Sequence, residues 1–352
     1  MKMKKVLAML LAAVMAASMA ACTGTAPAAT EAPAATEAPA ATAAATEAVT
    51  EAPAADTEAA KAYTVGICQL VQHPALDAAT EGFKAALTEA LGDAVTFSEQ
   101  NASGESTNCA TIINGFVSSN VDLILANATS PLQAAVSATS TIPVLGTSIT
   151  DYASALEIDN WTGTVGTNVS GTSDLAPLDQ QAAMLQELFP DAKTVGLLYC
   201  SAESNSKYQV DVIRGCLEAA GITCTDYAFT DTNDVASVAQ KAADDSDVIY
   251  IPTDNTAASN TEAIANVVIP AKTPVIAGEE GICKGCGVAT LSISYYDLGY
   301  ATGKMAVKIL TGEADISTMP VEYAPQVTKK YNVANCEALG ITVPEGYVAI
   351  ED

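Results

Sequence analysis

The chain has 352 residues and carries 41 acidic side chains against 15 basic ones, which gives a formal net charge of −26 at pH 7. This charge excludes nucleic acid and anionic membrane surfaces as partners, because both would repel the protein. The roughly 290 residues that follow position 60 are too many for one typical hydrophobic core and suit two domains.

The first 22 residues indicate export from the cytoplasm. Three lysines precede an apolar stretch at 6–19, which is too short to span a bilayer stably and is typical of a signal peptide. The stretch ends in Ala20-Ala21-Cys22, as in bacterial lipoproteins. We expect residues 1–22 to be the signal peptide and Cys22 to carry a lipid, so that an extracytoplasmic protein is held to the cell membrane by its N-terminus alone. The alternative is an ordinary secretory signal with a coincidental cysteine.

Residues 23–60 consist almost entirely of alanine, threonine, glutamate and proline, and Thr-Glu-Ala-Pro recurs at 30–33, 36–39 and 50–53. The segment has no aromatic residue to bury and its glutamates repel one another, so we expect a disordered linker. A partly helical linker is the alternative, but the prolines would interrupt it every few residues.

From residue 63 onward, short β-branched runs alternate with longer amphipathic stretches. The run at 63–69 is apolar until its last residue, and the stretch at 75–91 has apolar residues at helical spacing. The alternation continues through strand 94–98, helix 105–119, strand 121–125, helix 130–139 and strand 142–145. This order predicts a parallel, doubly wound sheet.

The same pattern restarts in the second half of the chain. Its helices are expected at 177–188, 206–220, 233–244 and 256–268, and its strands at 194–199, 222–228, 247–251 and 274–277. A strand at 288–293, a helix at 295–311 and a segment near 326–333 are too few for a third domain, so we expect them to complete the first two. The predicted fold is therefore α/β, with two Rossmann-like doubly wound lobes joined by a hinge. Lobe 1 is expected to comprise 61–173 plus 293–318, and lobe 2 to comprise 174–292 plus 319–352.

Open parallel sheets bind ligands beyond the carboxyl ends of their strands. The residues that follow the predicted strands are unusually polar: Gln69 and His73, 127–130, 147–151, 201–206, 253–255, 279–280 and 294–296. We expect two such edges to face each other across the hinge and to form one cleft.

Eight cysteines remain beyond Cys22. Cys216 and Cys224 flank a predicted helix-to-strand turn and could form a disulfide. Cys283 and Cys286 form a C-x-x-C pair after a glycine-rich loop, where free thiols or a local disulfide are expected, because no second cluster or nearby histidine completes a zinc site. The sequence predicts neither a metal nor a cofactor.

Five segments carry a more specific signal: Gln69-Leu-Val-Gln-His73-Pro-Ala-Leu-Asp77, Gly171-Thr-Ser-Asp-Leu175, Glu203-Ser-Asn-Ser206, Pro252-Thr-Asp-Asn255 and Ser294-Tyr-Tyr-Asp-Leu-Gly299. In this order and at these intervals they resemble the tryptophan/tyrosine-type substrate-binding proteins of ABC transporters, which share the type I periplasmic-binding-protein fold. The resemblance covers essentially all of 63–340, and no single segment would be enough to indicate the family.

The resemblance implies a clamp that closes on a small zwitterion, often an aromatic amino acid, and delivers it to an ABC permease. Asp254 is the expected acceptor for the ligand's ammonium group, because a charge-assisted hydrogen bond is strong in a dry cleft. The expected carboxylate donors are Thr129, Ser130, Ser148 and Asn205. The expected wall around the ligand side chain is Gln69, His73 and either Tyr295 or Tyr296, and Asp174 and Ser294 complete the predicted ligand-binding set.

Some of these residues have a structural alternative. Asp254 is also placed to cap the helix at 256–268, and His73 to cap or pack at a helix start. Tyr295 and Tyr296 are adjacent, so on a helix they point about 100° apart and only one is expected to face the cleft. Relatives often carry aspartate where this chain has Ser294, which leaves the identity of the ligand open.

An enzyme is the main rival interpretation. The single histidine argues against a hydrolytic triad, and the sequence contains neither G-x-S-x-G nor a P-loop. We therefore expect a monomeric solute-binding protein without catalytic activity. Two alternatives stay open, namely a different solute (a branched-chain amino acid, nucleoside or sugar) and a sensor that reports its ligand to a receptor.

Overall fold

The structure is a computed structural model that describes residues 61–324 and 326–351. The expected signal peptide, Cys22 and the expected linker at 23–60 lie outside the described residues. Within the described part of the chain, no helix is both long enough and apolar enough to cross a membrane.

Lobe 1 contains a six-stranded sheet in the order β11-β5-β4-β3-β1-β2, in which all pairs are parallel. Its strands are β1 (Tyr63–Gln69), β2 (Val95–Asn101), β3 (Leu123–Asn127), β4 (Val144–Ile149), β5 (Val169–Ser173) and β11 (Glu322–Tyr323). Its helices are α1 (Pro74–Leu91), α2 (Ser106–Ser118), α3 (Thr129–Ala138), α4 (Tyr152–Ala155) and α11 (Tyr295–Leu310), with 3-10 turns η1 (Gly92–Ala94) and η2 (Ile316–Thr318).

Lobe 2 contains a seven-stranded sheet in the order β13-β12-β10-β9-β8-β6-β7, in which only the β10–β12 pair is antiparallel among the described strands. Its strands are β6 (Thr194–Cys200), β7 (Thr223–Phe229), β8 (Val248–Ile251), β9 (Val275–Ala277), β10 (Ala289–Ser292), β12 (Thr328–Tyr331) and β13 (Val348–Ala349). Its helices are α5 (Leu178–Leu188), α6 (Ser204–Ala219), α7 (Val235–Asp245), α8 (Asn255–Ala258), α9 (Thr261–Ala271), α10 (Glu280–Cys286) and α12 (Val333–Leu339).

Helices cover both faces of the lobe 1 sheet because its central strands are apolar at successive positions. Ile124 of β3 packs into a cluster with residues of α2 and α3, whereas its neighbours Leu123 and Leu125 pack with residues of α1 and α11. Side chains of a strand alternate between the two faces, so a continuous apolar run must be covered on both sides. The predicted pair of doubly wound α/β lobes is confirmed.

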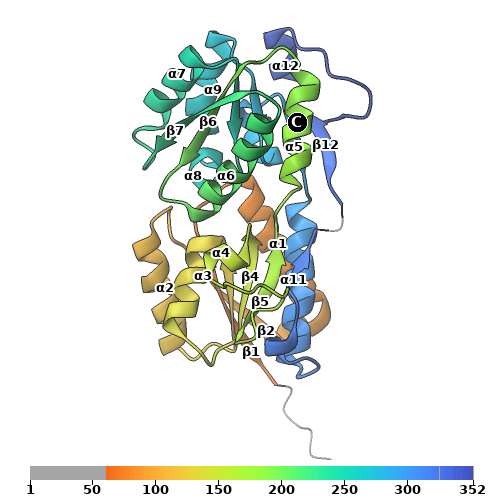
Figure 1. The fold of residues 1–352 in the computed structure, drawn as a ribbon. Helices are drawn as coiled ribbons and strands as arrows, with labels where there is room; N and C mark the ends of the chain where they lie inside the picture. Colours follow the sequence, from red (N-terminus) through yellow and green to blue (C-terminus); the bar gives the residue numbers. More distant parts are fainter. Residues whose placement is uncertain (1–60, 325, 352) are drawn as a thin grey trace, which may run out of the picture. The chain divides into compact units, whose positions relative to one another are not determined.

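The chain passes between the two sheets more than once. It crosses from β5 to α5, returns from β10 to α11, and crosses again between β11 and β12. Figure 1 accordingly shows α11 alongside α1 in lobe 1, although the two helices come from opposite ends of the described chain. The expected boundary at residue 319 differs from the observed pairing, because β11 pairs with β5 and so belongs to the lobe 1 sheet. This two-residue exposed strand has no hydrophobic pattern that a sequence could display.

Several elements near the strand ends differ from their predictions. Strand β4 continues through Ile149, whereas its polar end was expected to be loop. The glycine-rich run that begins at Gly281 is helical, because the Glu279 side chain accepts from the backbone N–H groups of Gly281 and Ile282 and so caps α10. The helix expected at 256–268 is two helices, α8 and α9.

Candidate functional site

The polar residues that follow the strands of lobe 1 gather at one edge of its sheet. In the observed order of strands, Asp174 follows β5, Ser148 lies at the end of β4, Thr129 follows β3 and His73 follows β1. Because all of these strands run parallel, their carboxyl ends meet at the same edge. All four residues are buried.

The corresponding edge of lobe 2 meets this edge directly at one hydrogen bond. His73 Nε2 lies 3.1 Å from Oδ1 of Asn255, the first residue of α8, and both side chains are buried. Asn255 is in turn fixed by Glu203, whose Oε2 accepts from its side-chain and backbone nitrogens at 2.6 and 3.1 Å. Asn255 and Glu203 were absent from the predicted ligand-binding set, although both lie in the polar segments 201–206 and 253–255 that the sequence singled out.

Asp174 lies where the chain leaves β5 for lobe 2. Its Oδ2 accepts a hydrogen bond of 2.9 Å from the Tyr295 hydroxyl, at the point where the chain has returned to lobe 1. The aspartate is only 4% exposed, and its Oδ1 has no hydrogen-bond partner. Burial raises the pKa of Asp174 above its ordinary value, and Tyr295, the Thr150 side chain and the backbone of Asp174 itself oppose that rise.

Ser148 is set apart from the ladder of β4 by a change of register between Gly146 and Ile149. Its backbone has φ 56°, in the left-handed region that non-glycine residues seldom adopt. Its buried hydroxyl also lacks a hydrogen-bond partner. The bulge therefore turns a polar side chain out of the sheet at the edge where Asp174 and His73 lie.

Unpaired buried atoms concentrate in the predicted set. Among the described residues, five buried side-chain polar atoms lack a partner, and three of them are His73 Nδ1, Ser148 Oγ and Asp174 Oδ1. Buried polar groups are nearly always hydrogen-bonded, and an unpaired one costs about 1–3 kcal/mol. Two of them, Ser148 Oγ and Asp174 Oδ1, lie at the ends of the neighbouring strands β4 and β5 and are typical of a site that a polar ligand completes.

Three further carboxylates are buried at the corresponding edge of lobe 2, and each of their oxygens already accepts a hydrogen bond. Asp254 Oδ1 caps α8 at Ala257 N, and its Oδ2 accepts from the backbone N–H of Cys200 at 2.6 Å. Glu203 accepts from Asn255 and Thr256, and Glu279 accepts from the backbone of α10. Burial, with Glu203 nearby, raises the pKa of Asp254 to about 7, and burial raises the pKa of Glu279 to about 7. The capping alternative for Asp254 is thus observed, and Asp174 is left with the free oxygen.

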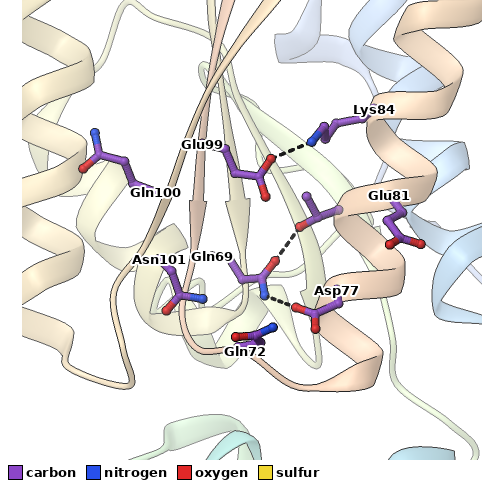
Figure 2. A pocket seen from close by; sticks show the side chains of 9 residues that line it. Gln69, Gln72, Asp77, Glu81, Lys84, Glu99, Gln100 and Asn101 are labelled. Carbon is purple, nitrogen blue, oxygen red and sulfur yellow. Dashed lines mark hydrogen bonds and ion pairs between the residues drawn. The ribbon is translucent and has the colours of Figure 1, made fainter.

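Three predicted residues, Gln69, Ser294 and Tyr296, are engaged elsewhere or exposed. Gln69 donates to Asp77 Oδ1 and accepts from Thr80, so that it holds the first turns of α1 against β1. Figure 2 shows it in a pocket of about 520 Å³ beside β2, where Lys84 pairs with Glu99. Ser294 is exposed and caps α11. Tyr296 is 44% exposed, whereas Tyr295 is buried, as the spacing on a helix requires.

The remaining two predicted residues lie near the cleft. Asn205 is buried and donates to Glu203, Ser206 and the carbonyl of Thr253. Ser130 is half-buried and helps to line a pocket of about 310 Å³ to which both lobes contribute, including Val71, Glu203 and Asn255. This pocket lies between residues that follow strands of both sheets, but His73, Thr129, Ser148 and Asp174 do not line it.

The cysteines of the described residues are not paired with one another. All eight described cysteines are free, so the Cys216–Cys224 disulfide is not formed in this structure. No group of histidine, cysteine and carboxylate side chains suited to a metal ion occurs among the described residues. Trp161 stacks on Tyr152 with ring centroids 6.3 Å apart and belongs to the lobe 1 core.

Comparison with known proteins gives concordant matches. A family model described as ABC transporter substrate binding protein matches residues 64–350. The chain is 34% identical to a tyrosine-binding protein of Clostridioides difficile (strain R20291) over 264 residues, which is 74% of this chain and 76% of that protein. A Streptococcus pneumonia ABC domain in complex with L-Trp is 33% identical, with a TM-score of 0.78 over 82% of this chain and 100% of that one. A ligand-free, open substrate-binding protein with adhesive properties from Clostridium difficile is 37% identical, with a TM-score of 0.63 over 82% of this chain and 99% of that one.

Proposed function

Because this chain belongs to the ABC transporter substrate-binding protein family, we propose that it captures a neutral aromatic amino acid between its lobes and delivers it to an ABC permease. The family comprises solute-binding proteins of the type I periplasmic fold, not enzymes. The proposed location is extracytoplasmic, with anchoring by a lipid on Cys22.

The observation that carries the proposal is the free oxygen of Asp174. Of the four buried carboxylates at the two edges, only Asp174 has an oxygen without a partner, Oδ1. A ligand ammonium group is the natural partner for it, because a charge-assisted hydrogen bond offsets the cost of burying the carboxylate. One free carboxylate oxygen suits one ammonium group, which favours a monoamine over a diamine.

The charges of the buried side chains limit further which solutes the site can hold. Among the described residues no lysine or arginine is buried. A ligand carboxylate must therefore be held by neutral donors, for which Ser148 and Thr129 are the candidates at the lobe 1 edge. A second acidic group on the ligand would have no cation to meet it, so acidic amino acids and phosphorylated solutes are disfavoured.

The preference for an aromatic side chain follows from the relatives. The tyrosine-binding protein and the L-Trp complex are each at least 33% identical to this chain across most of its length. Burying an aromatic side chain removes ~150–250 Å² from water, which contributes roughly 4–6 kcal/mol. That is a large share of the ~8 kcal/mol of a micromolar complex.

We also infer that the structure represents the closed form of the clamp. Its TM-score is higher with the L-Trp complex than with the open, ligand-free relative, 0.78 against 0.63, although the open relative has the more similar sequence. The buried hydrogen bond between His73 and Asn255 joins the two edges, as closure requires.

Thermal shift measurements test the proposal directly. The full chain is heated with each of the twenty amino acids, with nucleosides and with common sugars. We expect stabilisation by L-tyrosine or L-tryptophan that grows with concentration as RT ln(1 + [L]/Kd). Stabilisation by a sugar or nucleoside alone would overturn the amino-acid assignment, and no stabilisation by any solute would overturn solute binding.

Replacing Tyr295 by phenylalanine tests how Asp174 is positioned. The variant loses the hydroxyl that donates to Oδ2, so the pKa of Asp174 should rise further. We expect the affinity for L-tyrosine or L-tryptophan to fall about tenfold at pH 7, because a hydrogen bond to a charged group contributes about 1.5–3 kcal/mol. Calorimetric titrations between pH 5 and pH 8 should show the loss of affinity on acidification moved to higher pH.

Tyr296 supplies the matched control for that substitution. Its ring is exposed and stacks on Tyr300, and it was the alternative wall residue. Tyr296→Phe should leave both the affinity and its pH profile unchanged. Equal effects of the two substitutions would show that Asp174 is not held by Tyr295 in the way described.

A further inference from the structure

The imidazole of His73 is held in an arrangement that the solute site alone does not explain. His73 precedes α1 with extended backbone angles, φ −163° and ψ 163°, and its side chain makes no capping hydrogen bond. Pro74 at the first helical position has no N–H that would need a cap. The side chain is therefore free to leave its own helix, and it reaches across the cleft to Asn255 of lobe 2.

The surroundings of Asn255 fix the direction of this hydrogen bond. Its Nδ2 donates to Glu203 Oε2 at 2.6 Å, so its Oδ1 is the atom that faces the imidazole. A carbonyl oxygen can only accept, and His73 Nε2 must therefore carry the proton. Glu203 is itself held by the backbone and the hydroxyl of Thr256, both at 2.8 Å, so that the acceptor is rigidly placed.

The other ring nitrogen decides which protonation state the closed form admits. His73 is 6% exposed, and its Nδ1 is buried without a partner. With Nε2 already protonated, a second proton would place a charged N–H at Nδ1 with no acceptor, which is costly in a buried site. The closed arrangement therefore selects the neutral imidazole.

We propose that His73 and Asn255 form a latch between the lobes that closes only on a neutral imidazole, so that acidification opens the clamp and releases the solute. The latch rests on the proposed function for its solute, but it concerns closure rather than the contacts of Asp174. When the lobes separate, His73 is exposed to solvent and recovers an ordinary pKa of about 6.5. Closure below that pH then requires the release of one proton.

The charged groups that face His73 do not reverse the preference of the closed form for a neutral imidazole. Burial is the largest influence and lowers the pKa of His73, while the hydrogen bond to Asn255 and the charges of Glu203 and Asp77 oppose it. Asp77 lies one turn along α1 and already accepts a hydrogen bond from Gln69. Glu203 already accepts hydrogen bonds from the first residues of α8. A histidine whose pKa is lowered in the closed form stabilises closure above about pH 6.5 and loses that stabilisation as the pH falls.

Calorimetric titration of the full chain with L-tyrosine and L-tryptophan between pH 7.5 and pH 5.5 tests the latch. One proton released on closure weakens affinity about tenfold over this range. His73→Gln keeps a donor for Asn255 but cannot titrate, and should lose this part of the pH dependence; any slope that remains belongs to Asp174. Asn255→Ala removes the acceptor and should weaken binding at pH 7.5 as well. An unchanged slope in His73→Gln would overturn the latch.

A second measurement keeps the latch separate from the proposed function. His73 is the one histidine in the 352 residues, so its imidazole proton resonances are unambiguous in the full chain. The latch as proposed also holds the lobes together before an amino acid is added, so we expect Asn255→Ala to move the His73 pKa toward 6.5 with or without added amino acid. If neither amino acid binds but this shift occurs, the proposed solute is wrong and the latch stands. A His73 pKa that is equal in the two proteins would overturn the latch.

Discussion

Asp174→Asn is expected to weaken the binding of L-tyrosine or L-tryptophan by about 2–5 kcal/mol, or roughly 30- to 5,000-fold, as for the loss of one partner of a buried charged pair. The substitution keeps the shape of the side chain and an oxygen for the Tyr295 hydroxyl. It removes the negative charge at Oδ1, the atom that we assign to the ligand's ammonium group. Calorimetry at pH 7.5, where the ammonium group of the ligand is charged, measures the effect.

The same variant should not lose folding stability. Burial raises the pKa of Asp174, so its ionisation disfavours the folded state as the pH rises from the unfolded value of about 3.9 through the folded value. Asparagine removes that cost, and the melting temperature of the ligand-free protein at pH 7 should be equal or higher. A loss of affinity that is accompanied by a large fall in melting temperature would contradict a direct role in binding.

Asp254→Asn tests whether Asp254, rather than Asp174, accepts the ligand's ammonium group. Both oxygens of Asp254 accept from backbone N–H groups, those of Ala257 and Cys200. Asparagine has one acceptor oxygen, so it leaves one buried N–H unpaired at a cost of about 1–3 kcal/mol. We expect a lower melting temperature with a much smaller change in affinity than in Asp174→Asn. The opposite ranking of the two variants would restore Asp254 as the ammonium acceptor.

Gly299→Ala is expected to destabilise the fold by about 1–3 kcal/mol or more through overpacking. Gly299 lies on α11 where that helix crosses α1, and an added Cβ would lie 1.9 Å from the carbonyl oxygen of Ala79. Gly82 on α1 is in the same position toward α11, with the Tyr296 carbonyl 2.1 Å from its would-be Cβ. Backbone lies on both sides of this contact, so the helices must separate to admit a methyl group. Urea-induced unfolding followed by circular dichroism measures the loss.

Gly115→Ala provides the control for that prediction. Gly115 is exposed on α2, and nothing lies within 4 Å of its would-be Cβ. Alanine favours a helix over glycine by about 0.8–1.0 kcal/mol, so this variant should be more stable than the parent chain. Destabilisation of similar size in both variants would mean that the close approach of α1 and α11 does not limit the fold.

The sequence located the polar ends of the strands better than it predicted the hydrogen-bond partners of the residues there. Parallel strands carry their polar ends to one edge, so the segments after the strands could be named from periodicity alone. Which atom in each segment stays unpaired depends on partners from other elements. Asp254 and Asp174 both follow strands, but only the tertiary structure shows that Cys200 and Ala257 occupy the first, while Tyr295 leaves one oxygen of the second free.

Local regularities in the sequence determined the class of fold. Apolar runs and helical spacing identified the central strands and long helices, because these signals come from neighbours along the chain. Short elements were not predicted. Strand β11 is an exposed pair of residues, and α10 begins because the Glu279 side chain accepts hydrogen bonds from the backbone of the helix. Ser148 was expected in a loop, whereas a bulge near the end of β4 presents it at the sheet edge.

What the sequence by itself determined is that two α/β lobes carry polar strand ends, with a strongly acidic balance and no motif for catalysis. Only the tertiary structure decided which of those polar groups are satisfied within the protein and which stay without a hydrogen-bond partner. The physical reason is that hydrogen-bond satisfaction depends on atoms far apart in the chain: His73 meets Asn255, and Asp174 meets Tyr295, over sequence separations of 182 and 121. Periodicity reports which face of an element is buried, but it carries no information about such partners.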